Sequence, residues 1–101
     1  MKSIKILESA RADLVDGYRF YEHQAAGIGR YFLDSLYSDI ESLQISAGVH
    51  TKRFDRYHCL FSRRFPYAVY YRIVEDEIRI YAVLDCRRSP GRIRERLKET
   101  V

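Results

Sequence analysis

Two runs of residues in the second half of the chain alternate between apolar and polar side chains. They are Tyr67 to Val74 and Ile78 to Leu84, and the acidic cluster Glu75-Asp76-Glu77 separates them. Both runs are rich in β-branched and aromatic residues, which favour strands, and the acidic cluster has the length of a hairpin loop. The pattern therefore predicts a β-hairpin around which the rest of the chain is organised.

The alternation also predicts which face of the hairpin is buried. Because successive side chains of a strand point to opposite faces, residues two apart share a face. We expect the core face to carry Val69, Tyr71 and Ile73 from the first strand and Ile78, Ile80, Ala82 and Leu84 from the second. The opposite face, expected to be the wetter one, carries Tyr70, Arg72, Arg79 and Tyr81.

Two stretches in the first half have apolar residues at helical spacing. From Ala10 to about His23 the stripe consists of Ala10, Leu14, Tyr18 and Tyr21, and Ser9 is the predicted N-cap. In the second stretch the stripe consists of Phe32, Leu36, Ile40 and Leu43, while Asp34, Ser35, Asp39 and Glu41 are expected to face water.

The linker between these stretches, Gln24 to Gly29, is short, and Gly27 and Gly29 are expected to supply its backbone freedom. Two helices joined in this way predict an antiparallel hairpin that covers the apolar face of the sheet. Gly17 lies inside the first helix, where glycine costs roughly 1 kcal/mol relative to alanine, so we expect close packing against a neighbour there.

The remaining segments complete the predicted order of elements. Lys2 to Leu7 and Tyr57 to Ser62 are predicted strands, and the basic loop Lys52 to Arg56 precedes the second of them. Ser89-Pro90 predicts the start of a short, arginine-rich terminal helix through Leu97. The sequence thus predicts an α+β fold in the order strand, helix, helix, three strands, short helix, with the helical hairpin packed on a small, mainly antiparallel sheet. We expect residues 1–101 to form a single domain.

The composition, 47% apolar and 32% charged, is that of a globular rather than a disordered protein. No apolar run approaches the roughly 20 residues of a membrane span, and no signal-peptide core follows the first residues, so we expect a cytoplasmic protein without membrane contact. Cys59 and Cys86 are predicted to be free thiols. His58 is expected to be a partly buried strand residue, and His23 and His50 are expected to be solvated. We expect no metal or cofactor, because the sequence contains no motif for either.

Charge is unevenly distributed between the two halves of the chain. Residues 1–50 contain five Lys or Arg and seven Asp or Glu, whereas residues 51–101 contain thirteen and seven. Fourteen of the eighteen basic residues are Arg, which favours planar, bidentate contacts with phosphate or carboxylate groups. The basic half is therefore where we expect an anionic or acidic partner to bind.

Four motifs run through the predicted β-hairpin and the turn after it. They are Arg64-Phe65-Pro66-Tyr67, Tyr70-Tyr71-Arg72-Ile73, Ile80-Tyr81-Ala82-Val83-Leu84 and Arg87-Arg88-Ser89-Pro90. In the helical hairpin they are joined by Ala12-Asp13-Leu14, Tyr21-Glu22, Gly27-Ile28-Gly29, Phe32 and Leu36. With the predicted order of elements, these motifs resemble the RelE/ParE superfamily of toxins from bacterial type II toxin–antitoxin modules over nearly the whole chain.

The resemblance implies a compact toxin of the plasmid-stabilisation type, which a cognate antitoxin protein holds inactive in a hetero-oligomer. Three functions are open. Members that resemble ParE act on DNA gyrase, members that resemble RelE cleave messenger RNA on the ribosome, and a non-toxic relative would only bind an antitoxin-like partner. The first is favoured because no strong His or Lys base accompanies the arginines of the hairpin.

The resemblance and the charge pattern together indicate candidate site residues. Target or nucleic-acid binding is expected of Arg63, Arg64, Arg72, Arg87, Arg88 and Arg92. If the protein is a ribonuclease, it is a metal-independent one, and its catalytic candidates are Arg64, Arg72, Tyr81, Asp85 and Arg87. Arg63-Arg64 and Arg87-Arg88 flank one end of the hairpin, so we expect them to converge into a cationic patch.

Proton transfer is the harder requirement for a ribonuclease. Tyr70, Tyr81 and Asp85 are the proton carriers near the arginines. Many relatives carry His at the position of Asp85, and an imidazole there could move a proton near neutral pH. An ordinary carboxylate would instead repel phosphate, which argues against an acid–base role at this position.

Overall fold

The computed structural model describes residues 2–54 and 56–99 of the chain. Its elements are β1 (Ser3–Ile6), α1 (Glu8–Gln24), α2 (Ile28–Glu41), α3 (Leu43–Ser46), β2 (Lys52–Arg53), β3 (Tyr57–Phe61), β4 (Tyr67–Val74), β5 (Glu77–Asp85) and α4 (Pro90–Glu99). Each element predicted from the sequence is present, with ends a few residues from those expected. The short elements α3 and β2 were not predicted, and β2 lies in the segment expected to be a basic loop.

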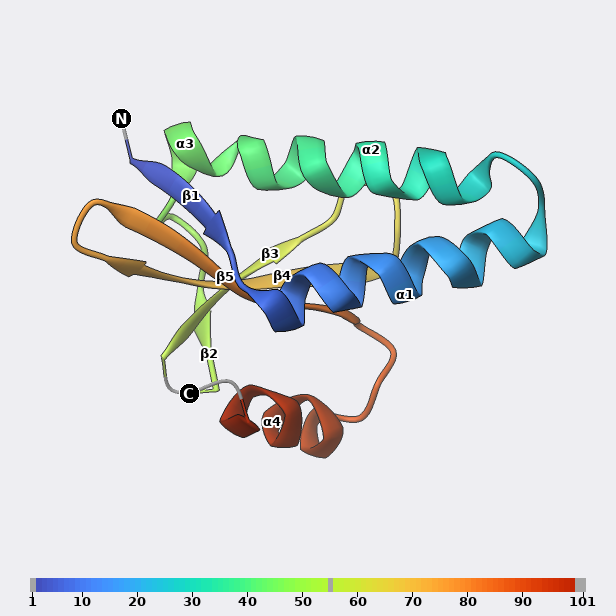
Figure 1. Cartoon of the computed structure of the whole chain (residues 1–101). Helices are drawn as coiled ribbons and strands as arrows, with labels where there is room; N and C mark the ends of the chain where they lie inside the picture. The colour runs from blue at the N-terminus through green and yellow to red at the C-terminus, as the bar shows by residue number, and fades with distance from the viewer. Residues whose placement is uncertain (1, 55, 100–101) are drawn as a thin grey trace.

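The described strands form one sheet of five strands in the order β1-β5-β4-β3-β2. β1 pairs with β5 in parallel, whereas the other neighbours pair antiparallel. Figure 1 shows α1 and α2 side by side over one face of this sheet and α4 on the opposite side. The predicted α+β fold with a mainly antiparallel sheet is therefore confirmed, as three layers with the sheet in the middle.

The hairpin formed by β4 and β5 contains a β-bulge. Tyr70 pairs with Ala82 and Tyr71 pairs with Ile80, so Tyr81 is an extra residue in β5. Because an extra residue shifts the alternation of one strand, every side chain beyond it faces the other way. Tyr81 and Ala82 thus lie on the same face, and Val83 returns to the face covered by α1 and α2.

The bulge corrects the predicted core face. Val69, Tyr71, Ile73, Ile78 and Ile80 pack under the helical hairpin as expected. Ala82 and Leu84 do not, because they follow the bulge and lie on the face toward α4. The expectation that this second face is wet is also wrong at its centre, where Tyr70 is 3% exposed and Tyr81 is 6% exposed.

A second core lies between the sheet and α4. Ile93 and Leu97, one helical turn apart on α4, are buried against Tyr57, Cys59, Ala68, Tyr70, Tyr81, Ala82 and Leu84. The hydroxyl of Tyr57 donates to the carbonyl of Leu97 at 3.2 Å. Ser89 precedes α4 as the predicted N-cap, with its carbonyl accepting from the amides of Arg92 and Ile93. A helix of only 10 residues is marginal in isolation, so α4 depends on this core.

Most residues of the predicted stripes of α1 and α2 form the main core, whereas Tyr18 and Tyr21 of the α1 stripe are only half-buried. Ala10, Leu14, Phe32, Leu36 and Ile40 are all at most 2% exposed. The polar side of α2 is only partly as predicted: Asp34 and Glu41 are exposed, but Ser35 and Asp39 are buried, at 5% and 8% exposure. Both cysteines are free thiols, as predicted. In the described part of the chain, no helix is long and apolar enough to cross a membrane.

The turn between α1 and α2 is held by the carboxylate of Glu22. It accepts hydrogen bonds from the amides of Gly27 at 3.1 Å and Gly29 at 2.9 Å, two of the amides that a helix leaves unpaired at its start. Gly27 has φ +91°, where glycine is favoured. Gly29 does not supply backbone freedom as expected, because it lies within α2. A Cβ atom at Gly29 would lie 2.7 Å from the carbonyl oxygen of Tyr18, so it serves close helix packing.

Side chains of α1 complete the edge of β5 beyond the end of β1. The hydroxyl of Ser9 donates to the carbonyl of Tyr81 at 3.0 Å, and the amide of Val83 donates to Oδ2 of Asp13 at 2.9 Å. Ser9 is therefore not the N-cap that we predicted; Leu7 stands at that position without a side-chain cap. Unpaired backbone groups at a buried strand edge are costly, and these two contacts satisfy them.

Tyr71 anchors the segment that follows α3. Its hydroxyl oxygen accepts from the amide of Gly48 at 3.0 Å and lies 2.6 Å from Nδ1 of His50. Nδ1 of His58 lies 2.8 Å from the carbonyl of His50, and the His58 ring stacks on Tyr71 with centroids 5.0 Å apart. His58 is half-buried in its strand as predicted, whereas His50 is held in this cluster rather than simply solvated.

We predict that Gly17→Ala destabilises the protein. The new Cβ would lie 2.6 Å from Cε2 of Phe32 in the packed core. Overpacking of this kind costs about 1–3 kcal/mol, which outweighs the gain of about 1 kcal/mol in helix propensity. Gly91→Ala is the matched control, because nothing lies within 4 Å of a Cβ at this helical position. Urea unfolding of both variants measures the difference, and equal stabilities would contradict close packing at Gly17.

We predict that acid weakens the His50–Tyr71 contact. Burial lowers the pKa of His50 below its ordinary value of 6.5, and the nearby His58 lowers it further. Below pH 6.5 the unfolded chain therefore binds more protons than the folded chain, so the contribution of His50 to stability is present above pH 6.5 and is lost as pH falls. The difference in unfolding free energy between the wild type and His50→Ala should shrink on acidification. Tyr71→Phe should show the same response. If the difference in unfolding free energy from the wild type instead grows as pH falls, the proposed loss of the His50 contribution in acid is wrong.

Candidate functional site

A hollow of about 400 Å³ lies between α1 and the last residues of β5. Its lining combines three acidic residues, two arginines and several apolar or aromatic groups: Asp13, Asp16, Gly17, Phe20, Tyr67, Val83, Asp85, Arg87 and Arg88. Phe20 is 49% exposed although it is a large apolar side chain. A surface with apolar walls and charges of both signs suits a polypeptide better than a small apolar ligand.

Asp85 and Arg87 form a bidentate ion pair at one side of the hollow. Nε of Arg87 lies 2.9 Å from Oδ1, its Nη2 lies 2.7 Å from Oδ2, and the Arg87 amide also donates to Oδ1 at 2.8 Å. These bonds hold the pKa of Asp85 below its ordinary value and raise the pKa of Arg87. Asp85 is therefore ionised near neutral pH, and it balances the charge of Arg87.

A second ion pair joins three elements at the opposite wall. Nη1 of Arg96 on α4 lies 2.8 Å from Oδ1 of Asp13 on α1, while Oδ2 of Asp13 accepts from Val83 on β5. The two side chains are only 18% and 13% exposed. Burial raises the pKa of Asp13, and its hydrogen bond with Val83 and the charge of Arg96 lower it only in part. This pair ties α4 to the helical hairpin across the sheet edge.

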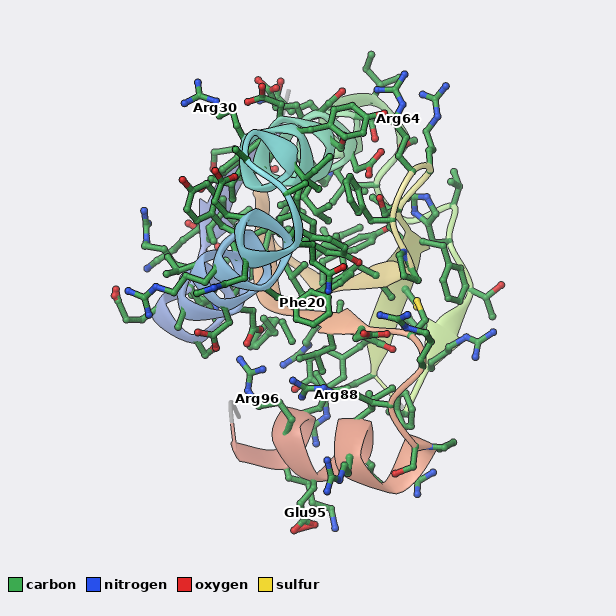
Figure 2. The ribbon with its side chains drawn as sticks, turned by 90° about the vertical axis from the view of Figure 1, so that its right-hand side faces the viewer. Phe20, Arg30, Arg64, Arg88, Glu95 and Arg96 are labelled. Atoms are coloured by element: carbon green, nitrogen blue, oxygen red, sulfur yellow. The ribbon has the colours of Figure 1, made fainter. Side chains whose placement is uncertain are left out.

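Arg88 and Arg92 lie where the hollow continues along α4. Figure 2 shows Arg88 and Arg96 in the space between α4 and the rest of the molecule, while Glu95 points away from it. A shallower hollow of about 320 Å³ is lined by Arg88, Gly91, Arg92, Glu95 and Arg96. Among the described residues, neither Arg88 nor Arg92 takes part in an ion pair. Both arginines are exposed, and the charge of Arg88 contributes to lowering the pKa of Asp13 and of Asp85 without a direct ion pair.

Arg63 and Arg64 lie elsewhere, beside α2. They line a separate hollow of about 100 Å³ together with Ser35, Ser38 and Asp39. The guanidinium of Arg64 lies over the ring of Tyr31, 5.8 Å from its centroid. Figure 2 places Arg64 at the α2 side of the molecule and Arg88 at the α4 side. The two arginine pairs flank one end of the hairpin, but their side chains do not converge into a single patch as we expected.

Arg72 and Tyr81 belong to neither hollow. The Arg72 guanidinium lies 5.9 Å from the centroid of the Tyr81 ring, and Tyr81 packs edge-on against Tyr57 beneath α4. Tyr70, the other tyrosine considered as a proton carrier, is buried on the same face. Burial also raises its pKa, so it holds its proton at neutral pH. The structure thus separates Arg72 and both tyrosines from the exposed arginines.

Several residues of these surfaces were not identified from the sequence as site residues: Asp13, Asp16, Phe20, Ser35, Asp39 and Arg96. The signal that could have indicated Phe20 is a large aromatic outside the apolar stripe of α1. Ser35 and Asp39 share a face of α2 four residues apart, but only the fold shows that this face is covered. Among the described residues, no three His, Cys, Asp or Glu side chains gather where they could hold a metal ion.

The sequence profile of one family, described as ParE toxin of type II toxin–antitoxin system, parDE, matches residues 4–90. The chain belongs to the ParE toxin family. This profile covers both helices of the hairpin, the sheet and the Arg87-Arg88 turn, whereas α4 beyond Pro90, with Arg92 and Arg96, lies outside the matched residues. The predicted membership of the RelE/ParE superfamily is thereby confirmed, and the chain is a toxin of the type II class.

A solved structure shows the same fold. The structure, titled as the chromosomal ParDE toxin–antitoxin system from P. aeruginosa, matches with a TM-score of 0.74 and 23% sequence identity, over 82% of this chain and 94% of that chain. At this identity the match establishes the ParE fold and not the contacts of individual residues. A comparison with curated protein sequences finds no match.

We predict that Arg96→Ala loosens α4. The change leaves the mostly buried carboxylate of Asp13 without its cation, which should lower the unfolding free energy by about 1–3 kcal/mol. Hydrogen exchange should accelerate most at the α4 amides around Ile93 and Leu97, because their helix is tied to α1 by this pair. Arg92→Ala, an exposed change on the same helix, is the control. Unchanged protection of α4 in Arg96→Ala would show that the pair does not hold the helix.

Proposed function

We propose that this ParE-family protein arrests bacterial growth by acting on DNA gyrase, and that a cognate antitoxin neutralises it by binding. The proposal places the protein in the cytoplasm, where both partners are found. The exposed arginines of the Arg87-Arg88 turn and α4 are proposed to recognise the target. We propose that this surface binds the target and does not catalyse a reaction on it.

We favour DNA gyrase over messenger RNA as the target because of the chemical groups that lie around the arginines. Cleavage of RNA needs a group that takes a proton from the 2′-hydroxyl and another that protonates the leaving oxygen. No His, Lys or Cys is among the residues that line the hollow. Its tyrosine, Tyr67, has a pKa raised to about 12 by burial, and Asp85 is kept ionised by Arg87. Such a surface is better suited to recognition than to proton transfer.

The distribution of neutralised and available cations supports recognition through Arg88 and Arg92. Asp85 balances Arg87, and Asp13 balances Arg96. Arg94 lies over the ring of Phe54 at 5.3 Å, so it also has a structural contact. Arg88 and Arg92 are exposed and, in the described part of the chain, make no ion pair. An exposed arginine that makes no ion pair attracts an anionic partner at a distance and donates directed hydrogen bonds to it on contact.

The experiment is induced expression of the chain in bacteria without any partner. We expect growth arrest with trapped gyrase–DNA breaks, and intact transcripts by primer extension in the same culture. The double variant Arg88→Glu, Arg92→Glu should reduce killing by about tenfold or more, because reversal of two recognition charges costs at least 1.4 kcal/mol of binding.

Arg30→Glu is the matched control for this charge reversal. Arg30 is exposed at the start of α2, where it pairs with Asp34, and Figure 2 shows it far from α4. Its variant should remain as toxic as the wild type. Cleavage of transcripts at ribosome-positioned sites would replace gyrase with a ribonuclease function. Absence of any growth arrest would leave only a non-toxic relative that binds an antitoxin-like partner.

A further inference from the structure

A row of arginines follows one flank of α4, starting in the turn before it. Arg92 and Arg96 lie one helical turn apart on α4, and they line the hollow of about 320 Å³ together with Arg88 of the turn. Residues 87–98 contain six Arg or Lys and one Glu. Because the apolar side of α4 is buried against the sheet, this arginine row is held at the surface of the molecule.

The acidic side chains near the arginine row balance only one of its members. Asp13 pairs with Arg96, and Figure 2 shows Glu95 directed away from the space that holds Arg88 and Arg96. Within residues 2–54 and 56–99, no ion pair includes Arg88 or Arg92. The row therefore presents positive charge to an anionic partner.

The lining of this hollow distinguishes between kinds of anionic partner. Among the described residues, those that line it are all charged apart from Gly91, and a Cβ atom at Gly91 would meet nothing within 4 Å. Protein interfaces normally have an apolar or aromatic centre, and pockets for small molecules are mostly apolar. Interfaces with DNA are more polar and more positive, and arginine is a common donor to phosphate oxygens. The lining thus favours the phosphate groups of a nucleic acid.

The same lining favours a duplex over a single strand. Proteins that bind single-stranded nucleic acid stack its bases on aromatic side chains. Among the described residues, no aromatic side chain lines the hollow, and the ring of Phe54 is covered by Arg94 instead. In a duplex the bases already stack on one another, so contacts to the phosphates are sufficient for binding.

Arg88 joins this hollow to the one between α1 and β5. The neighbouring hollow has apolar walls from Phe20, Tyr67 and Val83, so it suits a polypeptide. Two surfaces of different chemistry therefore lie side by side, one for a polypeptide and one for phosphate groups. A protein with DNA bound to it offers both kinds of group at once.

We propose that the arginine row of α4 binds the phosphate backbone of duplex DNA, and that this protein contacts the DNA that gyrase holds. The inference rests on the proposed function for the identity of gyrase, but the binding of duplex DNA follows from the row itself. Contacts to phosphates carry no sequence information, so binding should be independent of base sequence. Each neutralised phosphate also releases condensed counterions, so binding should weaken steeply as the salt concentration rises.

The binding of duplex DNA can be measured on the purified full chain by fluorescence anisotropy. The probes are two labelled duplexes, one rich in A·T pairs and one rich in G·C pairs, titrated over a range of salt concentrations. We expect both to bind alike, with a dissociation constant of about 1–100 μM, the range of non-specific binding. Absence of binding even at low salt, or tighter binding of a single-stranded RNA of the same length, would overturn the proposal.

Two double variants with the same loss of charge separate the arginine row from the net charge of the protein. Arg88→Gln, Arg92→Gln should make the slope of log K against log salt shallower by about 2, because each lost phosphate contact removes about 0.9 from the slope. Arg19→Gln, Arg30→Gln is the matched control, since both arginines are exposed on the helical hairpin and line neither hollow. The control should keep the wild-type slope, and an equal change in both variants would overturn the proposal.

Binding to gyrase separates DNA from an acidic protein surface as the group that the row contacts. We expect Arg88→Gln, Arg92→Gln to weaken binding to gyrase with bound DNA by about tenfold or more, and to leave binding to DNA-free gyrase unchanged. An equal loss with DNA-free gyrase would assign the row to the protein surface and overturn the inference.

These measurements also keep the inference apart from the proposed function. If the wild type neither binds gyrase nor arrests growth, the proposed function fails, while the titration with duplex DNA still decides the phosphate contact. If the wild type binds gyrase but not duplex DNA, only the inference about the arginine row fails.

Discussion

The structure depends on the extra residue in β5. With strict alternation, Ala82 and Leu84 would lie with Ile78 and Ile80 under the helical hairpin, and Val83 would lie on the opposite face with Tyr70 and Tyr81. The bulge at Tyr81 exchanges these positions, so that Ala82 and Leu84 extend the apolar surface that Tyr70 and Tyr81 form on the face toward α4. α4 can be stable only because this surface exists, and the position of its arginines follows from that.

The edge of β5 beyond the end of β1 depends on hydrogen bonds from α1. β1 ends at Ile6, so the carbonyl of Tyr81 and the amide of Val83 would face solvent or α1 without a strand partner. Ser9 and Asp13 on α1 provide the missing hydrogen bonds. Asp13 also binds Arg96, so the group that satisfies the strand edge is the one that fastens α4 to α1. Folding of the sheet edge and placement of the candidate recognition helix are therefore linked through a single carboxylate.

The arginine-rich composition supplies less available positive charge than the number of arginines suggests, because several of them are held by carboxylates or aromatic rings. The chain carries fourteen arginines, but near the candidate surface Asp85 and Asp13 neutralise Arg87 and Arg96, and aromatic rings hold Arg72 and Arg94. The cationic character of the α4 side thus comes from a few side chains rather than from the whole run. On the α2 side, Arg63 and Arg64 line a hollow with the buried Asp39, and within residues 2–54 and 56–99 none of these three side chains takes part in an ion pair.

The elements themselves could be predicted from the sequence. Helical stripes such as Phe32, Leu36 and Ile40, the alternation in β4, and the Ser89-Pro90 start of α4 are local patterns, and each formed the predicted element because the neighbours that determine it lie within a few residues. The motifs of the hairpin and turn likewise indicated the toxin superfamily. What could not be predicted depends on residues far apart in the chain.

The bulge is visible only in the pairing of β4 with β5, and the burial of Tyr70 and Tyr81 only in the packing of α4. Whether an arginine is free depends on a carboxylate that can lie 83 positions away, as for Arg96 and Asp13. Asp39 looked like a solvated helix residue because its own helix leaves that face open, and the β3–β4 loop closes it. The sequence by itself determined the elements and the surplus of positive charge, and the tertiary structure decided which charges and polar groups remain available to a partner.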